Sequence, residues 1–100
     1  MTDDQIRVYS HLRVKLTGDV RLASWVDEIG SVYVAATFPE IRLRCTIVRC
    51  PAVVAADPER ARRFATSAAL RIRIRVATCR AAEALQRIGR TLAVKGASER

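Results

Sequence analysis

Alternation between apolar and polar residues recurs four times along this chain. In residues 6–16 and 70–77 almost every even position is apolar, and residues 31–38 and 41–49 repeat the pattern. A two-residue period is typical of a β-strand that buries one face, because successive side chains point to opposite sides of the sheet. These four segments therefore predict four strands.

Signals for helices separate these segments. Asp19 is a candidate N-cap for a helix that ends at Gly30, and residues 57–59 combine a capping aspartate, a proline at the first helical position and an acidic first turn. A 3.6-residue period predicts a third helix over about residues 80–94. The resulting order predicts an α+β fold, a ferredoxin-like βαββαβ two-layer sandwich with an extra C-terminal helix.

Length and composition limit the class of protein. One hundred residues, half of them apolar and 28% charged, suit a single domain over residues 1–96 with a frayed tail at 97–100. They exclude a disordered chain and leave little room for a deep substrate cavity, so we do not expect an enzyme. The N-terminus lacks the features of a secretory signal, and no apolar run approaches the ~18 residues of a membrane-spanning helix. We therefore expect a soluble, cytoplasmic protein with no membrane partner.

Basic residues concentrate in the later part of the chain. The formal net charge of +8 divides into −2 for residues 1–40 and +10 for residues 41–100. Sixteen of the eighteen cations are arginine, whose planar guanidinium suits phosphate groups. This charge favours an anionic partner.

The predicted sandwich places many of these cations on one sheet face. In its strand order 4-1-3-2, the polar positions of the first, third and fourth strands share the face that the crossover helices leave open. Arginines on such a face can hold phosphates while an aromatic ring stacks on a base. We therefore predict a non-enzymatic protein that binds nucleic acid, RNA or DNA, mainly through its phosphates. The residues expected to contact nucleic acid are Arg7, Tyr9, Arg13, Lys15, Arg42, Arg44, Arg71, Arg73 and Arg75.

Two alternatives remain open. The basic face can be a solvated surface without a ligand, since long arginine side chains spread apart in water. Alternatively, the protein is a small assembly subunit or adaptor that binds an acidic protein, or a second copy of itself as a homodimer. This hypothesis depends on the uncharged edge strand at 31–38 and on the apolar stripe of the last helix, unless that stripe packs within the chain. The residues predicted for the interface are Leu85, Ile88 and Leu92.

Other chemistry finds little support in the sequence. Cys45, Cys50 and Cys79 lack the spacing of a zinc site or a disulfide framework, so we expect reduced thiols and no metal. His11, the single histidine, lies on another predicted strand far from Cys79, which leaves that thiol without a base for catalysis. No glycine-rich phosphate loop is present, and we expect no cofactor.

Overall fold

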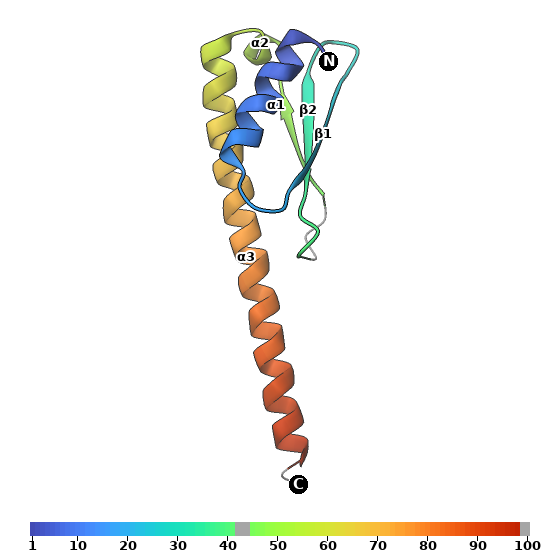
Figure 1. Cartoon of the computed structure of the whole chain (residues 1–100), viewed down its shortest axis with the longest axis vertical. Helices are drawn as coiled ribbons and strands as arrows, with labels where there is room; N and C mark the ends of the chain where they lie inside the picture. The colour runs from blue at the N-terminus through green and yellow to red at the C-terminus, as the bar shows by residue number, and fades with distance from the viewer. Residues whose placement is uncertain (42–44, 99–100) are drawn as a thin grey trace.

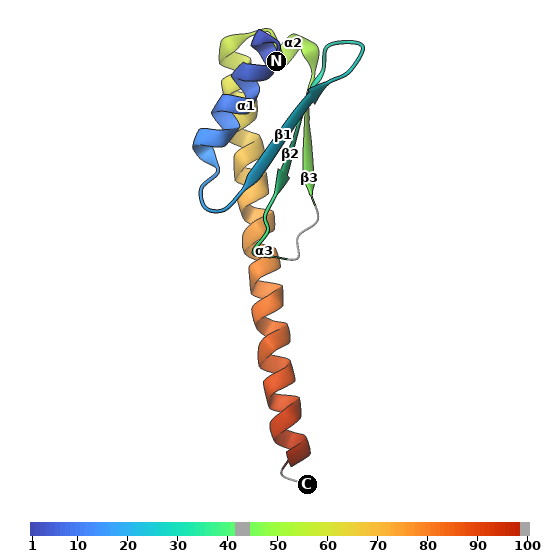
Figure 2. The same cartoon turned by 45° about the vertical axis from the view of Figure 1, so that its right-hand side comes forward.

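The computed structural model describes residues 1–41 and 45–98, with side chains described as far as residue 92. The elements follow the order α1 (Asp3–Lys15), β1 (Arg21–Val26), β2 (Val32–Thr37), β3 (Thr46–Cys50), α2 (Ala52–Ala55) and α3 (Pro58–Ser98). The strands form one antiparallel sheet in the order β1-β2-β3. Figure 1 and Figure 2 show α1 and α3 side by side on one face of this sheet. The fold is therefore α+β, and none of the described helices covers the other face of the sheet.

This order of helices and strands differs from the predicted ferredoxin-like βαββαβ order. Of residues 6–16, predicted as a strand, all but the last lie in α1, and residues 19–30, predicted as a helix, contain β1 and a turn. The predicted fourth strand, residues 70–77, and the predicted third helix, residues 80–94, are both parts of α3. Two predicted strands are thus helical and one predicted helix is a strand, and each difference has a local physical cause.

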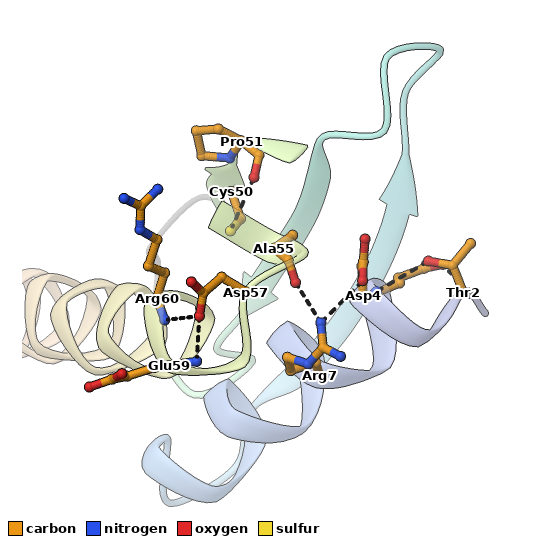
Figure 3. Close-up of polar contacts among 10 residues, drawn as sticks. Thr2, Asp4, Arg7, Cys50, Pro51, Ala55, Asp57, Glu59 and Arg60 are labelled. Carbon is orange, nitrogen blue, oxygen red and sulfur yellow. Dashed lines mark hydrogen bonds and ion pairs between the residues drawn. The ribbon is translucent and has the colours of Figure 1, made fainter. Parts of the chain in front are cut away.

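Two local predictions are confirmed. β2 and β3 form the antiparallel hairpin predicted over residues 31–49, although β3 begins at Thr46 and not at the predicted residue 41; residues 42–44 lie outside the described part of the chain. The predicted N-cap at Asp57 begins α3, because its carboxylate accepts hydrogen bonds from the backbone N–H groups of Glu59 (3.0 Å) and Arg60 (3.3 Å), as Figure 3 shows. Both features depend on residues close together in the sequence.

A capping box at the N-terminus of α1 overrides the alternation in that segment. The backbone N–H of Gln5 donates to the Thr2 hydroxyl (3.2 Å), and the Gln5 side chain accepts a hydrogen bond from the Thr2 N–H (3.3 Å). Thr-x-x-Gln is a sequence signature of this cap. In the helix Val8 and Leu12 are buried while Val14 is 81% exposed, because a 3.6-residue period sorts the side chains.

Two glycines and an aspartate turn the chain before and after β1. Gly18 (φ 89°) and Gly30 (φ 87°) adopt the left-handed backbone conformation that favours glycine. The Asp27 carboxylate accepts hydrogen bonds from the N–H groups of Ile29 (3.1 Å) and Ser31 (2.8 Å), which closes the turn between β1 and β2. Gly30, predicted to end a helix, therefore ends a hairpin turn.

The alternation of residues 70–77 divides between two faces of α3. Ile72 and Val76, one turn apart, are buried at 2% and 9% exposure. Leu70 and Ile74, also one turn apart, are 53% and 58% exposed. An eight-residue alternation thus fits a helix with two apolar faces as well as it fits a strand.

Small side chains let α3 approach the rest of the core closely. Four alanines on its inner face are fully buried against larger apolar residues of α1 and the sheet. Because protein interiors are packed without voids, alanines at these positions set the spacing between the helix and its neighbours. The buried core consists of Val8, Leu12, Leu16, Val32, Val34, Ala36, Phe38, Cys50, Ala55, Ala61, Ala65, Ala68, Ala69, Ile72 and Val76.

The length of α3 makes the molecule elongated. The structure measures 64 × 22 × 18 Å and has a radius of gyration of 18.2 Å, whereas a compact chain of this length has a radius of about 13 Å. The excess comes from the C-terminal part of α3, which extends beyond α1 and the sheet in Figure 1. The helix continues into the segment predicted as a frayed tail, of which residues 99–100 lie outside the described part of the chain.

The core position of Leu12 yields a stability prediction. Leu12 is 0% exposed, so Leu12→Ala leaves a cavity and should lower the free energy of unfolding by about 2–5 kcal/mol. Val14→Ala, on the exposed side of the same helix, should lower it by about 0.5 kcal/mol or less. Urea denaturation followed by circular dichroism measures both values. Equal losses for the two variants would contradict the orientation of α1.

Candidate partner-binding surface

The last part of α3 projects from the body of the protein. Val76 is the last buried residue of α3 among those whose side chains are described, and Glu83 and Ala84 are half-buried. Every side chain from Leu85 to Leu92 is exposed. Because isolated helices of this length are only marginally stable in water, the projecting part gains stability from any second surface that covers it.

A row of exposed apolar side chains runs along α3 on the side away from the core. Leu85 is 68% exposed, Ile88 56% and Leu92 64%. Leu70 and Ile74 belong to the same row, which therefore begins where α3 still packs on the body. Contiguous exposed apolar surface of this kind marks binding sites. We call this row the outer stripe, and its members are Leu70, Ile74, Ala77, Ala81, Leu85, Ile88 and Leu92.

The outer stripe follows an eleven-residue period. Leu70, Ala81 and Leu92 are spaced by eleven residues, and the other members follow the same period. Eleven residues make almost three turns of an α-helix, so the stripe runs nearly straight along the axis and is about 80° wide. A row this narrow is typical of the seam between two helices, since a face that packs on a broad core is wider than about 100°.

Arginines flank the outer stripe on both sides. At 3.6 residues per turn, Arg71 and Arg75 lie along one side of the stripe, and Arg73 and Arg80 along the other. The two ion pairs seen among the described residues, Arg7–Asp4 and Arg63–Glu59, involve none of these four. From residue 58 to residue 92 the helix carries nine arginines and two glutamates. The surface is therefore apolar along its centre and positive along both edges.

The structure distributes the predicted nucleic-acid-binding residues over two helices. Arg7, Tyr9, Arg13 and Lys15 lie on α1, Arg71, Arg73 and Arg75 lie on α3, and Arg42 and Arg44 lie outside the described part of the chain. The described members share no sheet face, because the predicted strands that carried them are helical. The residues predicted for a protein interface, Leu85, Ile88 and Leu92, all belong to the outer stripe.

Arg7 links two helices within the protein. Its Nη1 donates hydrogen bonds to the Asp4 carboxylate (3.1 Å) and to the carbonyl oxygen of Ala55 (2.7 Å), which joins α1 to α2 (Figure 3). Farther along α1, the Arg13 guanidinium donates to the Tyr9 hydroxyl (3.2 Å). Arg7 therefore has a structural role that the predicted strand did not reveal.

The uncovered face of the sheet carries an aromatic pair that sequence reasoning missed. Trp25 on β1 and Tyr33 on β2 are register partners, and their rings stack with centroids 5.5 Å apart and planes 2° apart. The Tyr33 hydroxyl donates to the Asp27 carboxylate (3.1 Å). Arg49, opposite Tyr33 on β3, donates to the Ser31 hydroxyl (2.9 Å). The helix predicted between Asp19 and Gly30 hid the pair, because a helix does not set Trp25 opposite Tyr33 on a neighbouring strand.

The turn beside this pair holds its aspartate ionised. Burial opposes the charge of Asp27, but the hydrogen bonds from the Ser31 N–H, the Tyr33 hydroxyl and the Ile29 N–H, with Arg49 nearby, lower its pKa below the usual 3.8. A lowered pKa means that the charge stabilises the fold above the usual pKa and that this contribution is lost as the pH falls through the folded value. The aromatic pair therefore belongs to a structurally fixed hairpin.

The three thiols are free and differ in exposure. Cys45 is exposed, Cys79 is half-buried and Cys50 is buried. Burial, with the negative charge of Asp4 nearby, raises the pKa of Cys50 to about 11. Within the described residues, no group of three His, Cys, Asp or Glu side chains could hold a metal ion.

The buried thiol gives a pH-dependent prediction. At pH 8, iodoacetamide should alkylate Cys45 in the folded protein and leave Cys50 unmodified, because the thiolate is the nucleophile. Between about pH 9 and about 11 the unfolded chain loses this proton while the folded chain keeps it, so the free energy of unfolding should fall as the pH rises. Mass spectrometry of peptides measures the labelling, with urea-denatured protein as the control. Equal alkylation rates for the two cysteines in the folded state would contradict the burial of Cys50.

Comparisons with known proteins give no match: no family model, no curated protein and no solved structure matches this chain. In the described part of the chain, no helix is both long and apolar enough to cross a membrane.

Proposed function

We propose that this protein is a non-enzymatic assembly subunit that binds a helix of another protein chain along the outer stripe of α3. The observation that carries the proposal is the straight row of five large apolar side chains, each more than half exposed. Removing such an apolar row from water lowers the free energy, and this gain is the main driving force for association. The residues are Leu70, Ile74, Leu85, Ile88 and Leu92.

The shape of the protein leaves this surface accessible. The buried residues of α3, among them Ala65, Ile72 and Val76, lie on the opposite side of the helix from the outer stripe. A second helix can therefore lie along the stripe without displacing α1 or the sheet. Ala77 and Ala81 sit near the middle of the stripe, where their small side chains allow a close approach.

Site-specific photocrosslinking in the native cell tests the proposed function. A photoreactive amino acid substituted for Ile88 should give a crosslinked protein adduct, because Ile88 lies on the outer stripe. The same substitution at Arg90, about 200° around the helix, is the matched control and should give at least tenfold less adduct. Gel electrophoresis with mass spectrometry measures the adducts. No adduct at Ile88, or equal adducts at both positions, would overturn the proposal.

The arginines of α3 favour a second candidate function, binding of nucleic acid. Nine arginines against two glutamates over residues 58–92 give the helix a strongly positive surface, and guanidinium groups contact phosphates well. Contacts of this kind do not depend on the nucleotide sequence, and the affinity that they provide falls steeply as the salt concentration rises. The arginines lie beside the stripe and are not members of it, so substitutions can remove either set separately.

Fluorescence anisotropy with labelled single-stranded RNA tests this second function. The triple substitution Arg71→Ala, Arg73→Ala, Arg75→Ala removes three cations and should weaken binding at least tenfold at ~50 mM salt. The double substitution Leu85→Ser, Ile88→Ser leaves all arginines and the net charge in place and should preserve most of the affinity. Co-purifying nucleic acid must be removed first and checked by absorbance. Absence of binding by the unmodified protein at this salt concentration would exclude the second function.

A further inference from the structure

The outer stripe has the same spacing in both directions along α3. The intervals between its successive members are 4, 3, 4, 4, 3 and 4 residues, with Ala81 at the centre. A row with palindromic spacing is matched by an antiparallel copy of itself when a twofold axis passes through the central member. We infer that the helix covering the outer stripe is α3 of a second copy of this chain, antiparallel to the first, with the axis at Ala81. This inference rests on the proposed function and names its partner.

The sizes of the stripe residues suit this antiparallel pair. At matching heights, Leu70 meets Leu92 of the other copy, Ile74 meets Ile88, and the large Leu85 covers the small Ala77. The two copies of Ala81 form the single layer made of small residues alone. Filled layers without voids are what helix seams require.

A parallel pair in register fits less well. It would set Ala77 against Ala77 and Ala81 against Ala81, which puts two layers of small residues next to each other at the centre of the seam. Neighbouring layers of alanine leave space that no side chain fills, and lost contacts of this kind weaken packing. The antiparallel arrangement avoids this gap because each Leu85 reaches an Ala77.

The flanking arginines permit the antiparallel pair. Arg71 lies beside Gly89 of the other copy, whereas Arg73 lies between Thr91 and Arg87 of the other copy, so only Arg73 has a second cation on its own flank. The two copies of Arg80 approach each other near the twofold axis. Along the helix direction they are offset by about two residues, or ~3 Å. Because this contact and the net charge of +8 on each chain are repulsive, salt should strengthen the association.

The basic end of the body suits the end of the partner helix. In the antiparallel pair, the C-terminal end of the second α3 lies beside a shallow depression whose lining includes Lys15, Arg62, Arg63 and Leu70. The C-terminus of a helix carries a partial negative charge, which cations stabilise. A parallel pair would place this helix end far from the depression, so the charge distribution favours the antiparallel orientation.

Molecular mass in solution is the first test. The unmodified chain, studied by sedimentation equilibrium, should give twice its monomer mass of 11.1 kDa and dissociate on dilution. Raising NaCl from ~50 to ~300 mM should lower the apparent dissociation constant, because it screens the repulsion between the two basic chains. A monomer at all concentrations up to ~100 μM at the higher salt, where dimers of micromolar affinity are largely assembled, would overturn the inference.

Substitutions in the outer stripe test whether the dimer forms through this surface. Leu85→Asp, Ile88→Asp should be monomeric and weaken association at least a hundredfold. The matched control Gln86→Asp, Arg90→Gln changes the net charge by the same amount on the opposite side of the helix and should remain dimeric. If both double variants dissociate equally, charge and not the stripe governs the dimer, which overturns the inference. Helicity measured by circular dichroism confirms that each variant is folded.

Disulfide trapping determines the orientation. In a Cys45→Ser, Cys79→Ser background, Ile74→Cys and Ile88→Cys are made as separate proteins and oxidised with copper phenanthroline. The mixture should give a heterodimer at least tenfold more abundant than the dimer of either protein alone, because like positions lie 14 residues, or about 21 Å, apart in the antiparallel pair. Efficient crosslinking of each protein with itself would indicate a parallel pair and overturn the inference.

The outcomes in solution and in the cell distinguish this inference from the proposed function. A monomeric chain whose Ile88 position crosslinks in the cell to a different protein would overturn the second copy as partner and leave the docking function intact. A monomeric chain that sediments with phosphatidylserine vesicles through the stripe would overturn both, because the occupant is then a membrane surface. A dimer trapped between positions 74 and 88, with the same self-adduct in the cell, would support both.

Discussion

The fold depends on the close packing of one alanine-rich face of α3 against α1 and the sheet. Ala61, Ala65, Ala68 and Ala69 have no exposed surface, so the helix lies near enough to pack against α1, which contributes Val8 and Leu12 to the core, and against β3. Dispersion contacts in such a core are individually small and collectively large. Since one face of the helix provides all of these contacts, the opposite face remains exposed as far as Leu92, the last residue whose side chain is described.

The inner face of α3 packs on the body of the protein, and the outer stripe continues from the body onto the projecting part of the helix. Ile72 and Val76 end the inner face, and the outer stripe begins at Leu70 and runs past the end of the sheet. The faces overlap for about two turns, so the projecting part is continuous with a segment that the core fixes. The surface that we propose for binding therefore starts on a rigid support, which reduces the ordering required when a partner covers it.

Local signals in the sequence predicted the parts of the fold that depend on neighbouring residues. The hairpin of β2 and β3 and the N-cap of α3 at Asp57 follow from turn and capping chemistry. Thr2 and Gln5 also form the sequence signature of a helix cap, but the alternation of residues 6–16 led to the prediction of a strand. The helical state of residues 70–77 was not predictable from alternation, because two apolar faces of a helix imitate the two faces of a strand. Leu85, Ile88 and Leu92 were predictable as one surface, because residues three or four positions apart share one face of any helix. Leu70 and Ile74 could be assigned to this surface only when residues 70–77 were known to be helical.

The eleven-residue period restricts how this protein can change in length. An insertion of eleven residues into the projecting part of α3 rotates the remainder of the helix by only about 20°, which extends the outer stripe by three turns and keeps its direction. An insertion of a single residue rotates everything beyond it by about 100°, which would bring arginines into line with the apolar row. Variation in the reach of this helix is therefore expected in steps of about 16 Å, the rise of eleven residues.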